Sequence, residues 1–165
     1  MALLSKACIY GIRASIYVAI EDGENKFIPI SKIAKELYLS SHFLTKILQE
    51  LTKKEIFESY KGPNGGVKLV KPAKDVSLME IVEAIDGKDL FEECALGLEG
   101  CGHYYPCPLH YSWVEHRESI KKLFNDENLY TLAESVKTAG FRLRAVDMNF
   151  IQKAGEAKKE ESTDK

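Results

Sequence analysis

A chain of 165 residues and 18.6 kDa has the size of one domain, or of a small domain with an appended arm. Its 45% hydrophobic and 29% charged residues are typical of a soluble protein and exclude a disordered or collagen-like chain. The formal net charge of −2 argues against a nucleic-acid binder, because such proteins are usually basic. The charge is unevenly distributed, however. Residues 1–78 hold twelve Lys/Arg against eight Asp/Glu, a net charge of +4, whereas residues 79–151 carry −6 and residues 152–165 carry zero.

The first twenty residues are apolar but include Lys6 and Arg13, so this stretch is too short and too polar for a membrane span. It also lacks the basic start and the small-residue cleavage site of a secretory signal. We therefore expect a cytoplasmic protein whose first segment, Ser5–Ile20, forms a core helix. The predicted inward stripe of this helix is Ile9, Ile12, Ile16, Tyr17 and Ile20.

Two short helical patterns follow, separated by a tight joint. Ser31 is the predicted N-cap of the first helix, which ends at Leu37. The joint comprises residues 38–40, and the next helix carries apolar residues at positions i, i+3, i+4 and i+7. Two helices joined this tightly predict a helix-turn-helix. Its expected core residues are Ile33, Ala34, Leu37, Leu44, Ile47, Leu48 and Leu51.

A hairpin is predicted directly after these helices. The strand-like runs Ile56–Tyr60 and Val67–Val70 flank the turn Lys61–Gly66, which contains Asn-Gly, a strong short-range hairpin signal. We expect Gly65 and Gly66 to supply the positive φ of this turn. A helix-turn-helix with a following hairpin is a winged helix, so residues 1–78 are the predicted winged helix-turn-helix domain.

The second half of the chain is less regular. Ser77 begins a predicted helix that runs to Ile85, whereas residues 94–110 are rich in Gly, Cys, Pro and His and have no periodicity. A long helix is expected over Trp113–Phe124 and a short one over Leu129–Val136. The candidate buried residues of the long helix are Trp113, Ile120, Leu123 and Phe124. Residues 79–138 are the predicted sensor and dimerisation region, and the C-terminal segment 139–165 is expected to be disordered from about residue 152.

The winged helix predicts a DNA-binding surface. In this fold the second helix enters the major groove, and polar side chains on its outer face meet bases and phosphates. The predicted DNA-binding residues are Ser41, His42, Thr45, Lys46, Lys61, Asn64, Gly65 and Gly66, with Gln49 as a further outward residue. Lys53, Lys54, Lys68, Lys71 and Lys74 add candidate phosphate contacts. A merely solvated face, or a protein-interaction module that never binds DNA, remains the alternative.

Three cysteines and a histidine form the pattern Cys-x6-Cys-x5-Cys-x2-His, with residues Cys94, Cys101, Cys107 and His110. Thiolate and imidazole ligands suit an iron–sulfur centre, copper or zinc. Structural zinc sites usually contain a closely spaced Cys pair, which this chain lacks, so the spacing favours an iron–sulfur cluster. Zinc and metal-free thiols remain open. Cys8 is either a small buried residue, a fourth ligand or a redox partner that reaches the cluster of another subunit.

No nucleophile elbow, zincin motif, P-loop or dinucleotide fingerprint is present in the sequence, so we do not expect an enzyme.

Several motifs carry a family resemblance. The residues that carry it are Ser5-Lys6, Tyr10, Arg13, Ile33-Ala34, Phe43-Leu44, Lys46-Ile47-Leu48, Lys61–Gly66, Ile81–Gly87 and the three cysteines. On these residues the chain resembles the IscR/NsrR (Rrf-type) family of bacterial winged-helix transcription regulators. The resemblance implies a homodimer that packs through a helix over residues 112–124 and binds a palindromic operator.

The resemblance also implies a [2Fe–2S] or [4Fe–4S] cluster on Cys94, Cys101 and Cys107, which would sense redox, nitric oxide or iron–sulfur status. Cluster-assembly regulators have a histidine fourth ligand, matched here by His110. Nitric-oxide-sensing relatives use an acidic residue whose position is Ile9 here, and isoleucine cannot ligate.

Three departures from the family pattern limit what can be carried over. The first cysteine step has six residues instead of five, and Thr45 stands where cluster-assembly regulators have a base-reading glutamate. Lys61 replaces an arginine, which keeps the charge but loses the bidentate fork. A zinc-dependent or metal-free thiol regulator with the same DNA-binding fold is therefore the alternative prediction.

Overall fold

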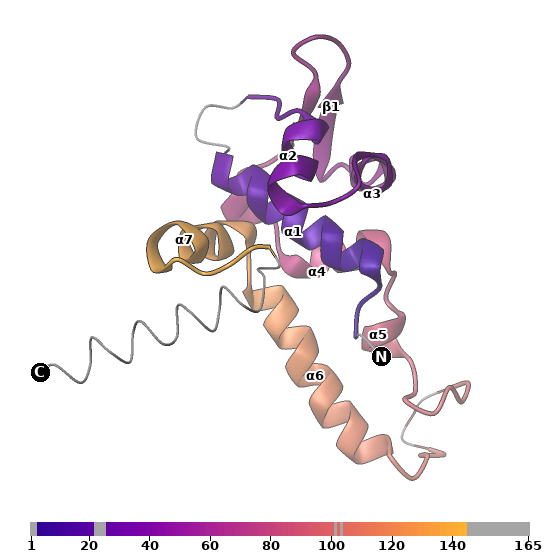
Figure 1. Cartoon of the computed structure of the whole chain (residues 1–165). Helices are drawn as coiled ribbons and strands as arrows, with labels where there is room; N and C mark the ends of the chain where they lie inside the picture. Colours follow the sequence, from indigo (N-terminus) through magenta and orange to yellow (C-terminus); the bar gives the residue numbers. More distant parts are fainter. Residues whose placement is uncertain (1–2, 22–25, 101, 103, 145–165) are drawn as a thin grey trace, which may run out of the picture.

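The computed structural model of the chain describes residues 3–21, 26–100, 102 and 104–144. It confirms the predicted fold class: the described residues are mainly helical, with one two-stranded antiparallel sheet. Figure 1 shows a head that contains α1–α4 and the hairpin, a long helix α6 that projects from it, and α7, which lies against the head again. None of the helices in the described ranges is long and apolar enough to cross a membrane.

Helix α1 (Lys6–Glu21) lies at the centre of the head. Of the predicted stripe, Ile16 is buried, and the other four residues are half-buried. The fully buried positions are small residues instead, because α1 is packed between α3, α4 and α7. At Gly11, for example, a Cβ would come 3.2 Å from the Ile47 Cγ2 atom of α3. Besides Ile16, the buried residues of α1 are Cys8, Gly11, Ala14, Ser15, Val18 and Ala19.

The predicted helix-turn-helix is present as α2 (Ile30–Leu37) and α3 (Ser41–Lys53), and all seven predicted core residues are buried. The expected N-cap is wrong, because α2 begins at Ile30, with Pro29 as its N-cap two residues before Ser31, and Ser31 is exposed in the first turn. The Pro29 carbonyl instead accepts hydrogen bonds from the N–H groups of Lys32 and Ile33, at 3.0 and 3.2 Å. Tyr38 takes the left-handed conformation, with φ 54° and ψ 46°, and turns the chain into α3.

The hairpin consists of β1 (Phe57–Tyr60) and β2 (Gly66–Leu69), which pair from Phe57↔Leu69 to Tyr60↔Gly66. Ile28 adds a bridge to Val67 through two hydrogen bonds of 2.9 and 3.0 Å, so the hairpin is tied to the chain before α2. The prediction of positive φ at Gly65 and Gly66 is wrong; within the turn, Gly62 has it, at 137°. The other two glycines are needed for space, since a Cβ on Gly66 would overlap the Ile28 carbonyl.

A short 3₁₀ turn, η2 (Ala73–Asp75), leads to α4 (Leu78–Ile85). The helix was expected to begin at Ser77; this residue is its N-cap, and its side chain forms a capping box with Glu80. One turn of helix, α5 (Asp89–Glu92), follows and was not expected from the sequence. The cysteine-containing loop then leads into α6.

The predicted long helix is α6 (His110–Asp126), which is longer than expected at both ends. Phe124 is buried and packs edge-to-face on Phe91, with ring centroids 5.8 Å apart. Trp113 and Ile120 are half-buried, but Leu123 is 56% exposed, so its predicted burial within the chain is wrong. Among the described residues, the covered positions of α6 include Trp113, Ile120 and Phe124, and Leu123 lies outside this contact.

Helix α7 (Leu129–Ala139) is capped by Asn128, whose side chain accepts a hydrogen bond from the Thr131 N–H at 3.0 Å. Leu129 and Ala133 join the core cluster of α1–α3. Arg13 of α1 fixes the residues after α7, because its guanidinium donates to the carbonyls of Leu37 and Leu143 at 3.0 and 2.8 Å. The predicted disorder of residues 152–165 concerns a part of the chain outside the described residues.

Candidate nucleic-acid interface and cysteine loop

The outer face of α3 and the hairpin lie at the same end of the head (Figure 1). Between them runs a groove of about 420 Å³, lined by parts of α2, α3 and the hairpin turn. Of the predicted DNA-binding residues, the structure brings Thr45, Lys61, Gly65 and Gly66 together in its lining. The groove is also lined by residues that the sequence analysis did not select: Ser31, Ser59 and Tyr60.

The other predicted residues flank this groove. Ser41, His42, Lys46 and Asn64 are exposed, so their polar groups face solvent. Thr45 is half-buried, and its Oγ1 donates to the Ser41 carbonyl at 2.8 Å, which leaves the hydroxyl lone pairs for an incoming donor. The face therefore combines hydroxyl, imidazole, amide and ammonium groups around one groove.

The candidate phosphate-binding lysines fall into two groups. Three of them face carboxylates: Lys53 lies 2.7 Å from Glu50, Lys68 lies 3.3 Å from Glu58, and Lys71 lies 2.6 Å from Glu80. Lys54, Lys61 and Lys74 have no ion pair within the part of the chain that the structure describes. Lys61, at the groove, is thus the best placed of the six to attract an anion.

The cysteine loop brings two of the predicted metal ligands together. Cys94 is buried directly after α5, Cys107 is half-buried, and their Sγ atoms lie 3.6 Å apart. This distance is well beyond a disulfide bond of about 2.05 Å, so the two residues are thiols. Cys101 lies outside the described residues. Within the described ranges, no three Cys, His, Asp or Glu side chains gather as a metal site.

His110, the proposed histidine ligand, is the first residue of α6 and is only 3% exposed. Its backbone N–H donates to the Cys107 carbonyl at 2.9 Å, so the residue is tied directly to the cysteine loop. Its ring lies edge-to-face against Tyr111, with centroids 5.2 Å apart. The imidazole is therefore buried at the junction of the cysteine loop and α6.

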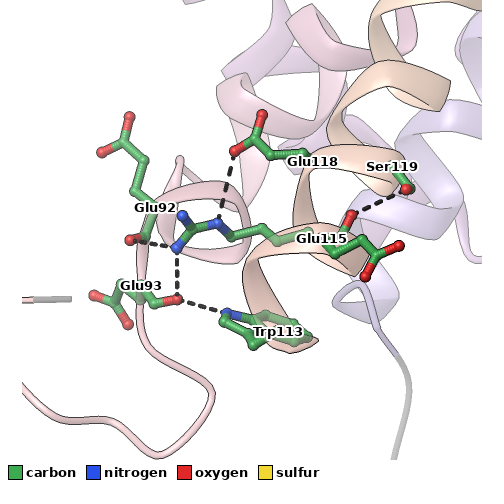
Figure 2. Close-up of polar contacts among 7 residues, drawn as sticks. Glu92, Glu93, Trp113, Glu115, Glu118 and Ser119 are labelled. Atoms are coloured by element: carbon green, nitrogen blue, oxygen red, sulfur yellow. Dashed lines mark hydrogen bonds and ion pairs between the residues drawn. The ribbon is translucent and has the colours of Figure 1, made fainter. Parts of the chain in front are cut away.

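Two side chains of α6 bind the backbone just before Cys94 (Figure 2). The indole Nε1 of Trp113 donates to the Glu93 carbonyl at 2.9 Å. The Nη1 of Arg117 donates to the carbonyls of Glu92 and Glu93, at 3.0 and 3.2 Å. These contacts attach the end of α5 to the N-terminal part of α6. Arg117 was not among the residues predicted from the sequence. Its spacing of four residues from Trp113 is the signal that places both on one face.

Cys8 lies in a different environment, fully buried in α1. It packs in a small apolar cluster with Met79, Val82, Phe91 and Phe124. Burial, together with the smaller effects of the Asp86 charge and a hydrogen bond to Asp86, raises the pKa of the Cys8 thiol from 9.0 to about 12. A thiol in this environment keeps its proton at neutral pH.

Comparison with known proteins agrees with this architecture. The family model Rrf2, described as an iron-dependent transcriptional regulator, matches residues 4–135. The transcriptional regulator IscR of Serratia proteamaculans is 30% identical over 136 residues, which are 82% of this chain and 79% of that protein. CymR, the global cysteine regulator of B. subtilis, has the same fold, with a TM-score of 0.69 and 22% identity over 81% of this chain and 98% of that one.

The structure of T. potens IscR also shares the fold, with a TM-score of 0.66 and 19% identity over 84% of this chain and 91% of the other. The family consists of transcriptional regulators and not of enzymes, which confirms the expectation from the absence of catalytic motifs. The match covers the winged helix, the cysteine loop and α6 together. The chain therefore belongs to the Rrf2 family of DNA-binding, winged-helix transcriptional regulators.

Proposed function

We propose that this chain is a cytoplasmic, homodimeric regulator that senses redox, nitric oxide or iron–sulfur status through a cluster held by its cysteine loop. In this proposal Cys94, Cys101 and Cys107 are the cysteine ligands, and His110 is the fourth ligand. A palindromic operator is read by Ser41, His42, Thr45 and Lys46 of α3, and by Lys61, Asn64, Gly65 and Gly66 of the wing. The observation that carries the sensor part is the pair of thiols, 3.6 Å apart, beside a buried histidine.

The geometry of the two thiols fits a shared inorganic centre. Two thiolates bound at about 2.3 Å to one tetrahedral metal lie about 3.8 Å apart, close to the Sγ–Sγ distance of Cys94 and Cys107. Sulfur ligands in a tetrahedral arrangement are typical of iron–sulfur and zinc sites. When bound, an iron–sulfur cluster would supply electron exchange and reactivity toward nitric oxide or oxygen. The protein's part is to hold the ligands and to exclude water around the buried Cys94.

His110 is a better candidate than Cys8 for the fourth ligand. It is hydrogen-bonded through its backbone to Cys107, and its side chain is buried. Cys8 instead fills space in an apolar cluster, and its raised pKa disfavours the thiolate that a metal requires. We therefore assign Cys8 a packing role.

Dimerisation through α6 is supported by its uncovered side. Leu123 is a large apolar residue near the C-terminal end of α6, and it is 56% exposed. A second copy of α6 would cover this residue, as a two-fold interface places the same surface of both subunits together. The loop of each subunit would then lie at the start of its dimer helix, and a change in the loop would alter the position of the two α3 helices.

A zinc-dependent or metal-free thiol regulator is the second candidate, because the 3.6 Å separation of Cys94 and Cys107 also suits two thiols that bind zinc or oxidise to a disulfide. The two candidates share the DNA-binding half and differ in their metal content and colour.

Anaerobic purification of the full chain, followed by iron and sulfide assays and a visible spectrum, separates these candidates. We expect iron and sulfide together with charge-transfer absorption, and His110→Ala should make this absorption labile in air while Cys8→Ala leaves it unchanged. A colourless protein with one zinc would overturn the cluster. Mapping of the genomic sites bound by the tagged protein tests the regulator itself, because enrichment without any palindrome would contradict a dimeric operator.

A further inference from the structure

We infer that Trp113 and Arg117 are positioning residues: together they clamp the end of α5 to α6 and so fix Cys94 relative to the dimer helix. Figure 2 shows the Trp113 side chain of α6 reaching the backbone of Glu93. The Arg117 guanidinium donates to the carbonyls of Glu92 and Glu93. Three donor–acceptor distances of 2.9 to 3.2 Å join them. Cys94 is the next residue, so any change in this contact moves a thiol directly.

The carbonyl groups at the end of α5 need such partners. A helix leaves its last carbonyls without partners inside the helix. Arg117 places a positive charge on two of them, and its side chain is only 13% exposed. A hydrogen bond from a charged donor in a partly buried setting is stronger than one between neutral groups.

The clamp also holds a helix that has few other contacts with its own chain. Of the seventeen residues of α6, His110 and Phe124 are the buried ones, near its two ends. Trp113 and Arg117 lie one turn apart between them, at the level of the cysteine loop. A shift of the loop would therefore be passed to α6 through these two side chains.

The role in signalling rests on the proposed function, but the positioning of Cys94 does not, so the first test uses iron-free, reduced protein. The rate of alkylation by iodoacetamide is measured at each cysteine by peptide mass spectrometry. In Arg117→Met and Trp113→Phe we expect Cys94 to react about tenfold faster, as loss of such hydrogen bonds eases local opening. Arg117→Lys, which keeps a charged donor, should restore most of the protection.

Cys8 serves as the control within the same molecule, because it is fully buried in α1. General destabilisation would accelerate both cysteines, whereas loss of the clamp accelerates Cys94 alone. Lys122→Met is the matched control variant, since it removes a positive charge from an exposed position of the same helix. Equal acceleration of Cys8 and Cys94, or no acceleration in Arg117→Met, would overturn the inference.

A second measurement tests transmission. The ratio of operator affinities with and without the cluster should approach one in Arg117→Met and remain at the wild-type value in Lys122→Met. An unchanged ratio in Arg117→Met would overturn the transmitting role. If the wild-type protein holds no iron, the proposed cluster is wrong. The alkylation rates of Cys94 then still test whether Trp113 and Arg117 hold this residue in place.

Discussion

Asp86 accepts two hydrogen bonds from Ser5, one from the backbone N–H at 2.8 Å and one from Oγ at 2.5 Å. The same Oγ accepts a bond from the Cys8 N–H at 3.0 Å and so caps the start of α1. Asp86 is in turn the C-cap of α4. One carboxylate thus joins the first turn of α1 to the end of α4, beside a hollow that Cys94 also lines.

We expect Ser5→Ala to lower the free energy of unfolding by about 1 kcal/mol, because the capping bond and the Asp86 contact are lost together. Urea unfolding followed by circular dichroism measures this. Ser119→Ala is the control: its hydroxyl bonds only to the Glu115 carbonyl within α6, and alanine favours a helix, so stability should change little. Equal effects of the two substitutions would contradict a special role of Ser5.

The raised pKa of Cys8 predicts that the free energy of unfolding falls at alkaline pH. Its pKa is about 12 in the folded chain against an ordinary 9.0, so between these values the unfolded chain loses the proton and the folded chain keeps it. The free energy of unfolding therefore falls as pH rises above 9, by up to about 1.4 kcal/mol per pH unit from this group. The contribution is fully present below pH 9.

Urea unfolding at pH 7.5, 9.0 and 10.0 tests this. Cys8→Ala should cost about 1 kcal/mol at pH 7.5 from lost packing, and its stability should fall less steeply than that of the wild type above pH 9. Parallel pH profiles of the two proteins would show that Cys8 is not the group responsible.

The helix-turn-helix could be predicted because its signals are local. Leu44, Ile47, Leu48 and Leu51 repeat with the helical period, and the Asn-Gly turn marks the hairpin within six residues. The predicted N-cap of α2 lies two residues too late, because Ser31 is a good cap by residue type, whereas the helix begins at Ile30 with Pro29 as its N-cap.

Features that depend on distant contacts could not be predicted in this way. Helix α5 has only four residues, and its end is held by Trp113 and Arg117, which lie twenty or more residues further along the chain. The helical period predicts that Leu123 is buried, but Leu123 is exposed in the single chain. A sequence pattern cannot say whether a residue is buried by its own chain or by a partner. The structure places the Sγ atoms of Cys94 and Cys107 3.6 Å apart, while the role of both as ligands and the place of Cys101 stay predictions.

If Lys46 and Lys61 contact DNA phosphates, their removal should lower the salt dependence of operator binding. Lys46→Gln and Lys61→Gln should each weaken operator binding and reduce the slope of log K against log salt by about 1, since each removes one phosphate contact. Lys53→Gln is the control, because Lys53 lies 2.7 Å from Glu50, whose carboxylate offsets part of its attraction for an anion, and we expect a smaller change in slope. Fluorescence anisotropy over a series of salt concentrations measures the slopes. An unchanged slope for Lys61→Gln would remove the wing turn from the interface.

Leu123 gives the sharpest test of dimerisation through α6. A single exposed leucine on a helix that is otherwise polar on that side contributes little within one chain, so Leu123→Arg should leave the melting temperature of the isolated chain nearly unchanged. At a two-fold interface the same change buries two guanidinium groups against each other, and we expect the dimer Kd to rise at least about 100-fold. Sedimentation equilibrium at several concentrations measures this.

Asn125→Arg is the control for this test. It adds the same charge two residues further on, on another face of the helix, and should leave the dimer Kd near the wild-type value. If both variants remain dimeric, the subunits associate through a surface other than this side of α6.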